Sequence, residues 1–226
     1  MISVKDLFVS FTKEYDALHN INLKIENGEK IALIGDSESG KTTLIRVLAS
    51  LQVATKGEVC IDQTPISKVN FKQDVALGYV PLVPVFKNKK TAYENMQYIL
   101  KIRGFDTASM NFKITSALKN FGVDGVRNVP ISSLTMCQKQ LLQLSRVSMR
   151  SLDIVLIDNI SKQLLSKEKQ QVIDAIKLLI ESQPNAIFVV ALDSEKLASE
   201  LGLKVIKLKN GSIVQSKEKT LPVENQ

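Results

Sequence analysis

The chain is poor in the residues on which many metal and redox sites depend. Its 226 residues include two cysteines, one histidine and no tryptophan. Cys60 and Cys137 lie far apart in the sequence without the spacing of metal ligands, so we expect small buried side chains in a reduced compartment. The single histidine, His19, is expected at the surface and has no predicted role as a ligand.

Long apolar runs are also missing. No run approaches the ~20 apolar residues that a helix needs to cross a bilayer. The N-terminal segment Met1–Asp6 lacks the charged and apolar regions of a signal peptide. We therefore expect a cytoplasmic chain, for which any role at a membrane depends on a partner.

The composition that is present is that of a globular protein. With 44% hydrophobic and 23% charged residues, 226 residues are enough for one large domain with a sizeable core. The net charge of +7 suits phosphate ligands, nucleic acid or an anionic membrane surface. Because the lysines are scattered, we interpret them as a solvated surface and expect no nucleic-acid partner.

The clearest motif follows the apolar run Ile31–Ile34. It reads GDSESGKT and fits the phosphate-binding pattern G-x-x-x-x-G-K-[ST]. Glycines permit backbone geometry that a side chain would block, and the amide groups and the next helix then face an anion. Lys41 is expected to reach the β- and γ-phosphates and Thr42 to bind Mg²⁺. The predicted nucleotide-binding residues are Gly35, Asp36, Ser37, Glu38, Ser39, Gly40, Lys41, Thr42 and Thr43.

A second motif supplies a partner for the metal. Ile154–Ile157 is apolar and ends in Asp158, which is the Walker B pattern. We predict that Thr42 and Asp158 together hold Mg²⁺ beside the bound nucleotide.

The order of segments predicts an α/β fold of the P-loop NTPase class. Strands alternating with helices favour a mostly parallel sheet covered on both faces. The turn at Asn27-Gly28 predicts an antiparallel hairpin that leads into the phosphate loop, Ser166 is expected to cap a helix, and Asn210-Gly211 predicts a closing hairpin. We expect one domain over 1–226, with a core of 1–82 and 152–226 and a helical subdomain at 83–151.

Over nearly its whole length the chain resembles the ATP-binding subunit of ABC transporters. The segments "LHNINLKIENGEKIALIGDSESGKTTLIRVLA", "TKGEVCID", "GYVP", "TAYEN", "VPISSLTMCQKQLLQLSRV", "DIVLIDN", "FVVALD" and "VIKLKNGSIV" stand in the order of that family. The resemblance implies an N-terminal antiparallel β subdomain, an inserted helical subdomain, Mg·ATP as cofactor and a membrane-embedded permease as partner. It also implies a second nucleotide-binding subunit, identical or different, and a position on the inner face of the cell membrane.

Several positions depart from the family's pattern. The glutamine of the Q-loop, the glutamate after Walker B and the switch histidine correspond to Leu82, Asn159 and Leu192. The D-loop aspartate corresponds to Leu165, and the second glycine of the phosphate loop to Glu38. In the signature, the serine and two glycines correspond to Thr135, Met136 and Cys137, whereas Leu134 and Gln138 agree.

These departures remove the implied catalytic groups but keep the implied binding groups. Asn159 cannot take a proton from water, so no catalytic residue is intact and we expect weak or absent hydrolysis of ATP to ADP and phosphate. In the family's head-to-tail dimer each nucleotide also meets the other chain's signature. Because this chain lacks both the base and the signature glycines, even an intact partner is expected to leave both composite sites impaired.

Other functions remain open on the sequence. The chain is alternatively an active ATPase that uses Asp193 or a partner's residues, or a non-catalytic interaction module with a relic phosphate loop. A small-molecule kinase is a more distant alternative. The aromatic residue that stacks on adenine is predicted to be Phe11, with Tyr15 as the alternative, although Phe11 could also belong to the core.

Overall fold

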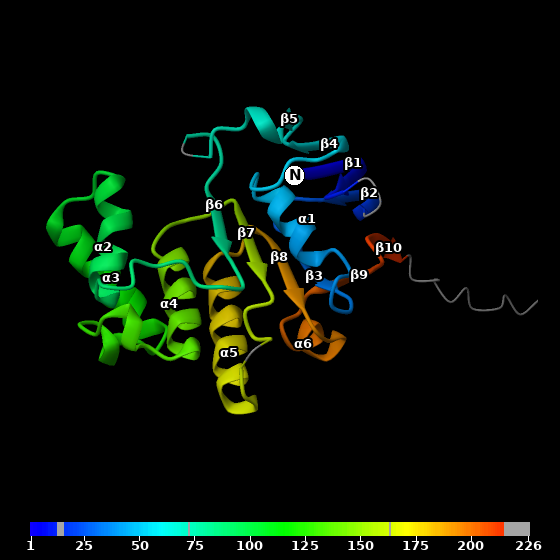
Figure 1. Ribbon diagram of the computed structural model, residues 1–226. Helices are drawn as coiled ribbons and strands as arrows, with labels where there is room; N and C mark the ends of the chain where they lie inside the picture. Colours follow the sequence, from blue (N-terminus) through cyan, green and yellow to red (C-terminus); the bar gives the residue numbers. More distant parts are fainter. Residues whose placement is uncertain (13–15, 72, 163, 215–226) are drawn as a thin grey trace, which may run out of the picture.

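The computed structural model contains two β-sheets, of which the six-stranded one lies at the centre and the four-stranded one at the upper right of the view (Figure 1). The structure describes residues 1–12, 16–71, 73–162 and 164–214. The four-stranded sheet has the order β2-β1-β4-β5 and contains β1 (Ile2–Ser10), β2 (Asp16–Ile25), β4 (Lys56–Ile61) and β5 (Thr64–Pro65). The six-stranded sheet has the order β10-β9-β3-β8-β7-β6 and contains β3 (Lys30–Ile34), β6 (Leu77–Val80), β7 (Ile154–Asp158), β8 (Ile187–Leu192), β9 (Lys204–Lys209) and β10 (Ser212–Val214).

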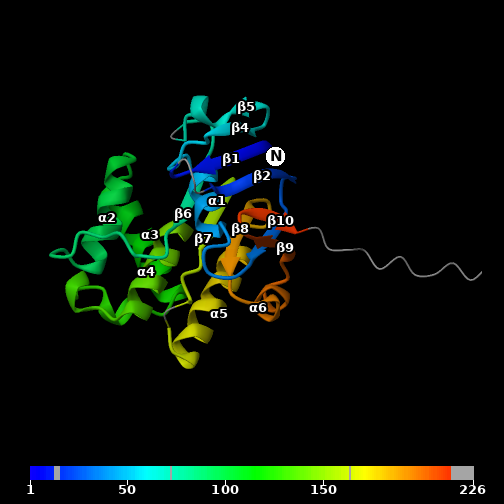
Figure 2. The same ribbon diagram turned by 45° about the vertical axis from the view of Figure 1, so that its right-hand side comes forward.

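The six-stranded sheet is covered on both faces, as the sequence predicts. In β3, Ile31 and Leu33 pack on one face and Ala32 and Ile34 on the other, and β7 and β8 alternate in the same way. One face packs against α1 (Lys41–Leu48) and the four-stranded sheet, and the opposite face packs against α4 (Met136–Ser148) and α5 (Ser166–Ser182) (Figure 2). Burial on both sides explains the almost continuous apolar sequence of these strands.

The predicted hairpin before the phosphate loop is wrong. Strand β2 pairs with β1 in the four-stranded sheet, whereas β3 pairs in parallel with β8 and β9. The turn at Asn27-Gly28 therefore links two sheets instead of two paired strands. The reason is burial, because β3 is apolar on both faces and gains more from parallel neighbours that are covered by helices than from an edge next to β2.

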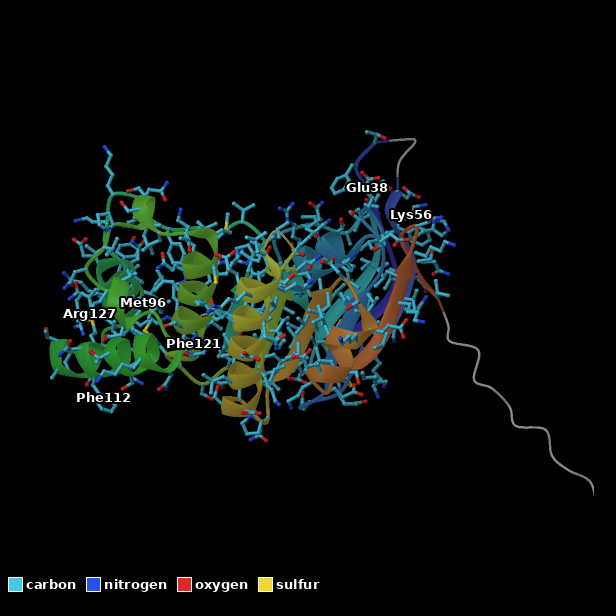
Figure 3. All side chains as sticks on the ribbon, turned by 90° about the horizontal axis from the view of Figure 1, so that it is seen from below. Glu38, Lys56, Met96, Phe112, Phe121 and Arg127 are labelled. Atoms are coloured by element: carbon cyan, nitrogen blue, oxygen red, sulfur yellow. The ribbon has the colours of Figure 1, made fainter. Side chains whose placement is uncertain are left out.

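Three helices form an insert at one end of the molecule (Figure 1, left): α2 (Ala92–Ile102), α3 (Thr107–Asn120) and α4 (Met136–Ser148). Thr91 and Thr135 begin α2 and α4 with capping boxes, which satisfy free amide groups of the first turns. Met96 and Phe121 lie inside this group of helices, whereas Phe112 points away from it (Figure 3). Arg127 ties the insert together by donating to Thr115 and Asn111 and by lying over the ring of Tyr93.

Helix α4 holds the segment that follows β6. Gln140 and Gln143 are buried and donate to the carbonyl oxygens of Leu82 at 2.9 Å and Pro81 at 3.2 Å. Arg146 donates to the carbonyl oxygen of Val85 at 3.0 Å. One face of α4 therefore fixes the backbone at three points of the entry to the insert.

The C-terminal third agrees with the sequence except at one helix start. The hairpin of β9 and β10 forms across Asn210-Gly211, as predicted. Helix α5 (Ser166–Ser182) follows Leu165 without a side-chain cap, so the expectation that Ser166 caps this helix is wrong; Ser166 is its first helical residue. Helix α6 (Glu195–Glu200) is capped by Ser194. No helix in the described ranges is long and apolar enough to span a membrane.

The connecting 3-10 turns are short. They cover Ile66–Lys68, Asp124–Val126 and Ile131–Ser133.

Candidate nucleotide-binding site

The loop between β3 and α1 has the geometry of an anion cradle. A Cβ at Gly35 would lie 2.2 Å from the carbonyl oxygen of Leu208, which leaves no room for a side chain. Gly40 has φ +100°, and a Cβ there would lie 2.7 Å from the carbonyl oxygen of Ala17. Both glycines of the motif are therefore required by the backbone. The chain turns directly into α1, so the amide end of this helix faces the loop.

Lys41 lies buried inside this loop. Its Nζ donates to the carbonyl oxygens of Gly35 at 2.5 Å and Asp36 at 2.8 Å, and to Ser39 Oγ at 3.2 Å. Burial lowers the pKa of Lys41, and the charge of Asp193 opposes that shift. A cation held among oxygen acceptors in this way can exchange these contacts for phosphate oxygens.

Thr42 and Asp158 meet at the carboxyl edge of the sheet. Thr42 Oγ1 donates to Asp158 Oδ1 at 2.9 Å, although the two residues are 116 positions apart in the sequence. Burial raises the pKa of Asp158, whereas the hydrogen bond from Thr42 and the charges of Arg46 and Lys41 lower it. A hydroxyl and a carboxylate fit Mg²⁺, which usually takes one or two protein ligands together with substrate phosphates. Within the described ranges, no cluster of three or more His, Cys, Asp or Glu side chains offers another metal site.

A pocket of about 360 Å³ opens above the loop. It is lined by Ser37–Thr43 together with Phe11, Ala17, Leu82, Asn159 and Lys162. The structure thus brings most of the predicted binding residues together, whereas Gly35 and Asp36 support the loop and do not line the pocket. Asp158 lines an adjoining pocket of about 610 Å³ that shares Thr42 and Leu82.

Phe11 is 55% exposed at this pocket, so the alternative that places it in the core is wrong. Tyr15 lies outside the described residues.

Glu38 has φ +66°, a left-handed conformation that favours the glycine which the family resemblance places there. Glu38 lies at the opposite end of the molecule from Phe112 of the helical insert (Figure 3).

Asn159, the residue after Asp158, has a side-chain amide that contacts the carboxylate of Asp193. Asn159 is 6% exposed, and its Nδ2 donates to Asp193 Oδ1 at 2.6 Å. Its Oδ1 is buried without a hydrogen-bond partner in the described part of the chain. Leu192 is 1% exposed and packs in the hydrophobic core, so it does not line the pocket.

Thr135–Cys137, which correspond to part of the family's signature, form the start of α4 and include both exposed and buried side chains. Thr135 caps α4, and Met136 is partly exposed. Cys137 is buried, and burial raises the pKa of its thiol, so it is a packing residue and not a reactive one. Cys60 is likewise a free, buried cysteine, as expected. Leu165 is 77% exposed at the position that the resemblance assigns to an aspartate.

Sequence reasoning missed Lys162. Its Nζ donates to Ser37 Oγ at 2.9 Å, so this side chain reaches from the loop after β7 to the phosphate loop. The signal in the sequence is its position four residues after Asp158, since loops that follow parallel strands meet at one edge of the sheet.

The class of protein follows from this combination of phosphate loop, Walker B strand and helical insert. The sequence pattern of the ABC transporter family matches residues 18–162, which is more than half of the chain. The chain belongs to the ABC transporter family.

Similar proteins cover several transport systems. The chain is 28% identical over 96% of its length to the methionine import ATP-binding protein MetN 1 of Enterococcus faecalis. It is 30% identical over 90% of its length to the sulfoquinovosyl glycerol transport ATP-binding protein SmoE of Agrobacterium fabrum. It spans only 63% and 57% of these two relatives.

Solved structures support the fold. A dimeric, post-hydrolysis structure of the ATP-binding cassette MJ0796 bound to ADP and Pi superposes with a TM-score of 0.80 and 26% identity. The match covers 95% of this chain and 97% of that one. The chain therefore has the fold of an ATP-binding cassette, with a mostly parallel sheet, an N-terminal antiparallel β subdomain and a helical insert.

Proposed function

We propose that this chain is an ATP-binding subunit of a membrane transport complex that binds Mg·ATP but hydrolyses it slowly or not at all. The observation that carries the proposal is the contact between Thr42 and Asp158 beside a buried Lys41. These residues would hold Mg²⁺ and the phosphates. The divided core, with 1–82 and 152–226 around the helical part 83–151, belongs to the same proposal.

The binding half of the site is complete in this proposal. Gly35 and Gly40 shape the loop, Lys41 supplies the charge, and Ser37–Thr43 line the pocket, where their backbone amides would bind the phosphates. Phe11 is the aromatic residue at the opening and is proposed to stack on adenine.

The catalytic half is impaired in this proposal. Asn159 is a neutral amide in the place of a general base, and losing such a base typically costs about 10²–10⁴ in rate. Leu192 offers no donor to the γ-phosphate, and losing such a donor costs about 10²–10³. The two losses need not multiply, because residues of one catalytic unit are not additive. Leu82 stands where the family resemblance implies the Q-loop glutamine, so a residue near the metal is also replaced. Thr135–Cys137 likewise replace the serine and the two glycines of the signature.

The proposed partners are a membrane-embedded permease and a second nucleotide-binding subunit. The dimeric assembly of MJ0796 supports the second partner. The chain would then lie in the cytoplasm, peripheral to the inner face of the membrane. The relatives' names include methionine import and macrolide export, so they do not select a cargo or a direction.

Calorimetric titration of Mg·ATP into the purified chain tests the proposal. Lys41→Ala should abolish binding, because the only buried cation of the loop is lost. Lys177→Ala is the matched control, since Lys177 is exposed on α5 and does not line the pocket. Absence of binding to the unaltered chain at millimolar nucleotide would refute the proposal and favour the interaction module.

A second candidate is an active ATPase in which Asp193 serves as the base. The hydrogen bond of 2.6 Å from Asn159 places the Asp193 carboxylate next to the position of the missing glutamate. This candidate predicts measurable phosphate release that Asp193→Asn removes while ATP binding persists. Phosphate release at the level of Lys41→Ala would exclude it.

A further inference from the structure

Lys162 is held at the phosphate loop by its own turn and by one side-chain contact. Its backbone N–H donates to the carbonyl oxygen of Asn159 at 3.1 Å, and its Nζ donates to Ser37 Oγ at 2.9 Å. The side chain is exposed and lines the same pocket as Lys41. In the described part of the chain, no carboxylate pairs with its ammonium group.

The position of Lys162 in the pocket indicates which part of a bound nucleotide its ammonium group would contact. The pocket lining includes Phe11, the residue proposed to stack on the base, and Thr42, which donates a hydrogen bond to Asp158. A Mg²⁺ ion in such sites bridges the β- and γ-phosphates. Lys162 comes from the turn directly after Asp158 and its ammonium group contacts Ser37 of the phosphate loop, so the terminal phosphate of a triphosphate held with Mg²⁺ at Asp158 would be the nearest phosphate to it.

The charges around Lys41 favour an anion between the two lysines. Lys41 and Lys162 both line this pocket, so two ammonium groups face the same space. Two cations within electrostatic reach of each other repel until an anion lies between them.

We propose that Lys162 binds the terminal phosphate of a nucleoside triphosphate from within the same chain and thereby makes the site prefer ATP over ADP. It would take the place of a γ-phosphate donor at the end of β8, where this chain has the buried Leu192. Lys162 is thus a specificity-determining residue. This inference rests on the proposed binding of Mg·ATP.

Affinities of Lys162→Ala for two ligands test this role. The ligands are Mg·ADP and the Mg complex of an ATP analogue with a β,γ-imido bridge, which prevents turnover during calorimetry. Loss of a charge-assisted contact at an exposed site should weaken the triphosphate analogue by about tenfold. Affinity for ADP should stay within about twofold, because ADP does not reach this contact.

Control variants separate charge from folding. Lys162→Arg retains the charge and should keep the preference for the triphosphate, and Lys177→Ala should change neither affinity. Each variant should unfold within about 2 °C of the unaltered chain, because Lys162 is exposed.

The outcomes distinguish the inference from the function on which it rests. If the unaltered chain binds both ligands and Lys162→Ala weakens them equally or not at all, the role of Lys162 is refuted and Mg·ATP binding stands. If the unaltered chain binds neither ligand, the proposed function fails and the inference fails with it.

Discussion

Asn159 Nδ2 donates a hydrogen bond of 2.6 Å to Asp193 Oδ1, and this bond joins the carboxyl ends of β7 and β8 at the proposed nucleotide site. A glutamate at position 159 could not make this contact as a carboxylate, because it has no proton to donate. The amide therefore stabilises Asp193 where a second acid would repel it.

Asn159→Glu should not restore rapid hydrolysis. Leu192 remains buried in the core and supplies no donor, so we expect the rate of phosphate release to rise by less than about tenfold. Steady-state phosphate release from the variant and from the unaltered chain is the measurement. A rise of about 10² or more would show that the remaining machinery is intact.

The same substitution should make stability depend on pH. Two neighbouring carboxylates raise the pKa of one of them above its value in the unfolded chain. The folded state then binds more protons, so stability falls as the pH rises through that pKa. The midpoint temperature of unfolding of Asn159→Glu should fall below that of the unaltered chain, and the difference should be larger at about pH 8 than at about pH 5. Asn159→Gln, which keeps the neutral amide, should lack this difference.

Asp158→Asn should stabilise the chain without ligand and abolish its Mg-dependent binding. Burial raises the pKa of Asp158 in the folded state, so its ionisation opposes folding above that pKa. Asparagine keeps an acceptor for the Thr42 hydroxyl without the charge. We expect a larger free energy of unfolding in urea near neutral pH, and a smaller gain as the pH falls toward the ordinary range of aspartate.

For Asp158→Asn, nucleotide titration in Mg²⁺ completes the measurement. Retained Mg-dependent affinity would contradict the proposed role of Asp158. If the gain in the free energy of unfolding were the same near neutral pH and in the ordinary titration range of aspartate, the proposed cost of the buried charge would be contradicted.

Glu38 offers a pair of substitutions that separate strain from charge. Its φ of +66° costs a residue with a side chain about 1–2 kcal/mol. Glu38→Gly should remove this strain, offset by about 0.5–1 kcal/mol of chain entropy in the unfolded state. Glu38→Ala removes the carboxylate but keeps the strained backbone.

Both variants should bind ATP more tightly, since a negative charge is removed from the lining of the pocket. Only Glu38→Gly should gain stability in urea unfolding. Weaker binding by both variants would mean that the carboxylate helps the site, for example through the metal shell.

Gln143→Leu should destabilise the fold by about 1–3 kcal/mol, because removing its amide leaves one buried and one partly buried acceptor unpaired. These acceptors are the carbonyl oxygen of Pro81 and Oε1 of Gln140. Urea unfolding measures the change, and the control is Gln170→Leu at an exposed position of α5, where the lost hydrogen bonds to Asp174 and Glu200 are also exposed. A loss below about 0.5 kcal/mol would show that water replaces the lost donor.

The sequence was sufficient to predict the fold class and the phosphate loop, because both depend on local patterns. Apolar strands such as Ile31–Ile34 are visible as runs, and Gly35 and Gly40 stand at fixed spacing. The partner of β3 was not predictable, because Asn27-Gly28 fits a hairpin turn as well as a link between two sheets. Local turn chemistry does not encode which strand pairs with which.

Contacts across the site depended on the assembled sheet. Asn159 and Asp193 are 34 residues apart, and Lys162 and Ser37 are 125 apart. Each pair meets only because parallel strands end at the same edge. Nothing in the spacing of Lys162 and Ser37 distinguished this contact from a solvated lysine.

The contacts of α4 with the chain after β6 determine how the helical insert can move. A hinge needs a linker whose backbone dihedral angles are free to change, yet the carbonyls of Pro81, Leu82 and Val85 are bound to Gln143, Gln140 and Arg146. Rotation of the insert must either break these bonds or carry the linker with it. If the bonds hold, tilting α4 pulls on Leu82 in the wall of the pocket. Motion of the insert is then coupled to the nucleotide site, so a force that a partner applies to the outer surface of the insert would displace Leu82 in the pocket.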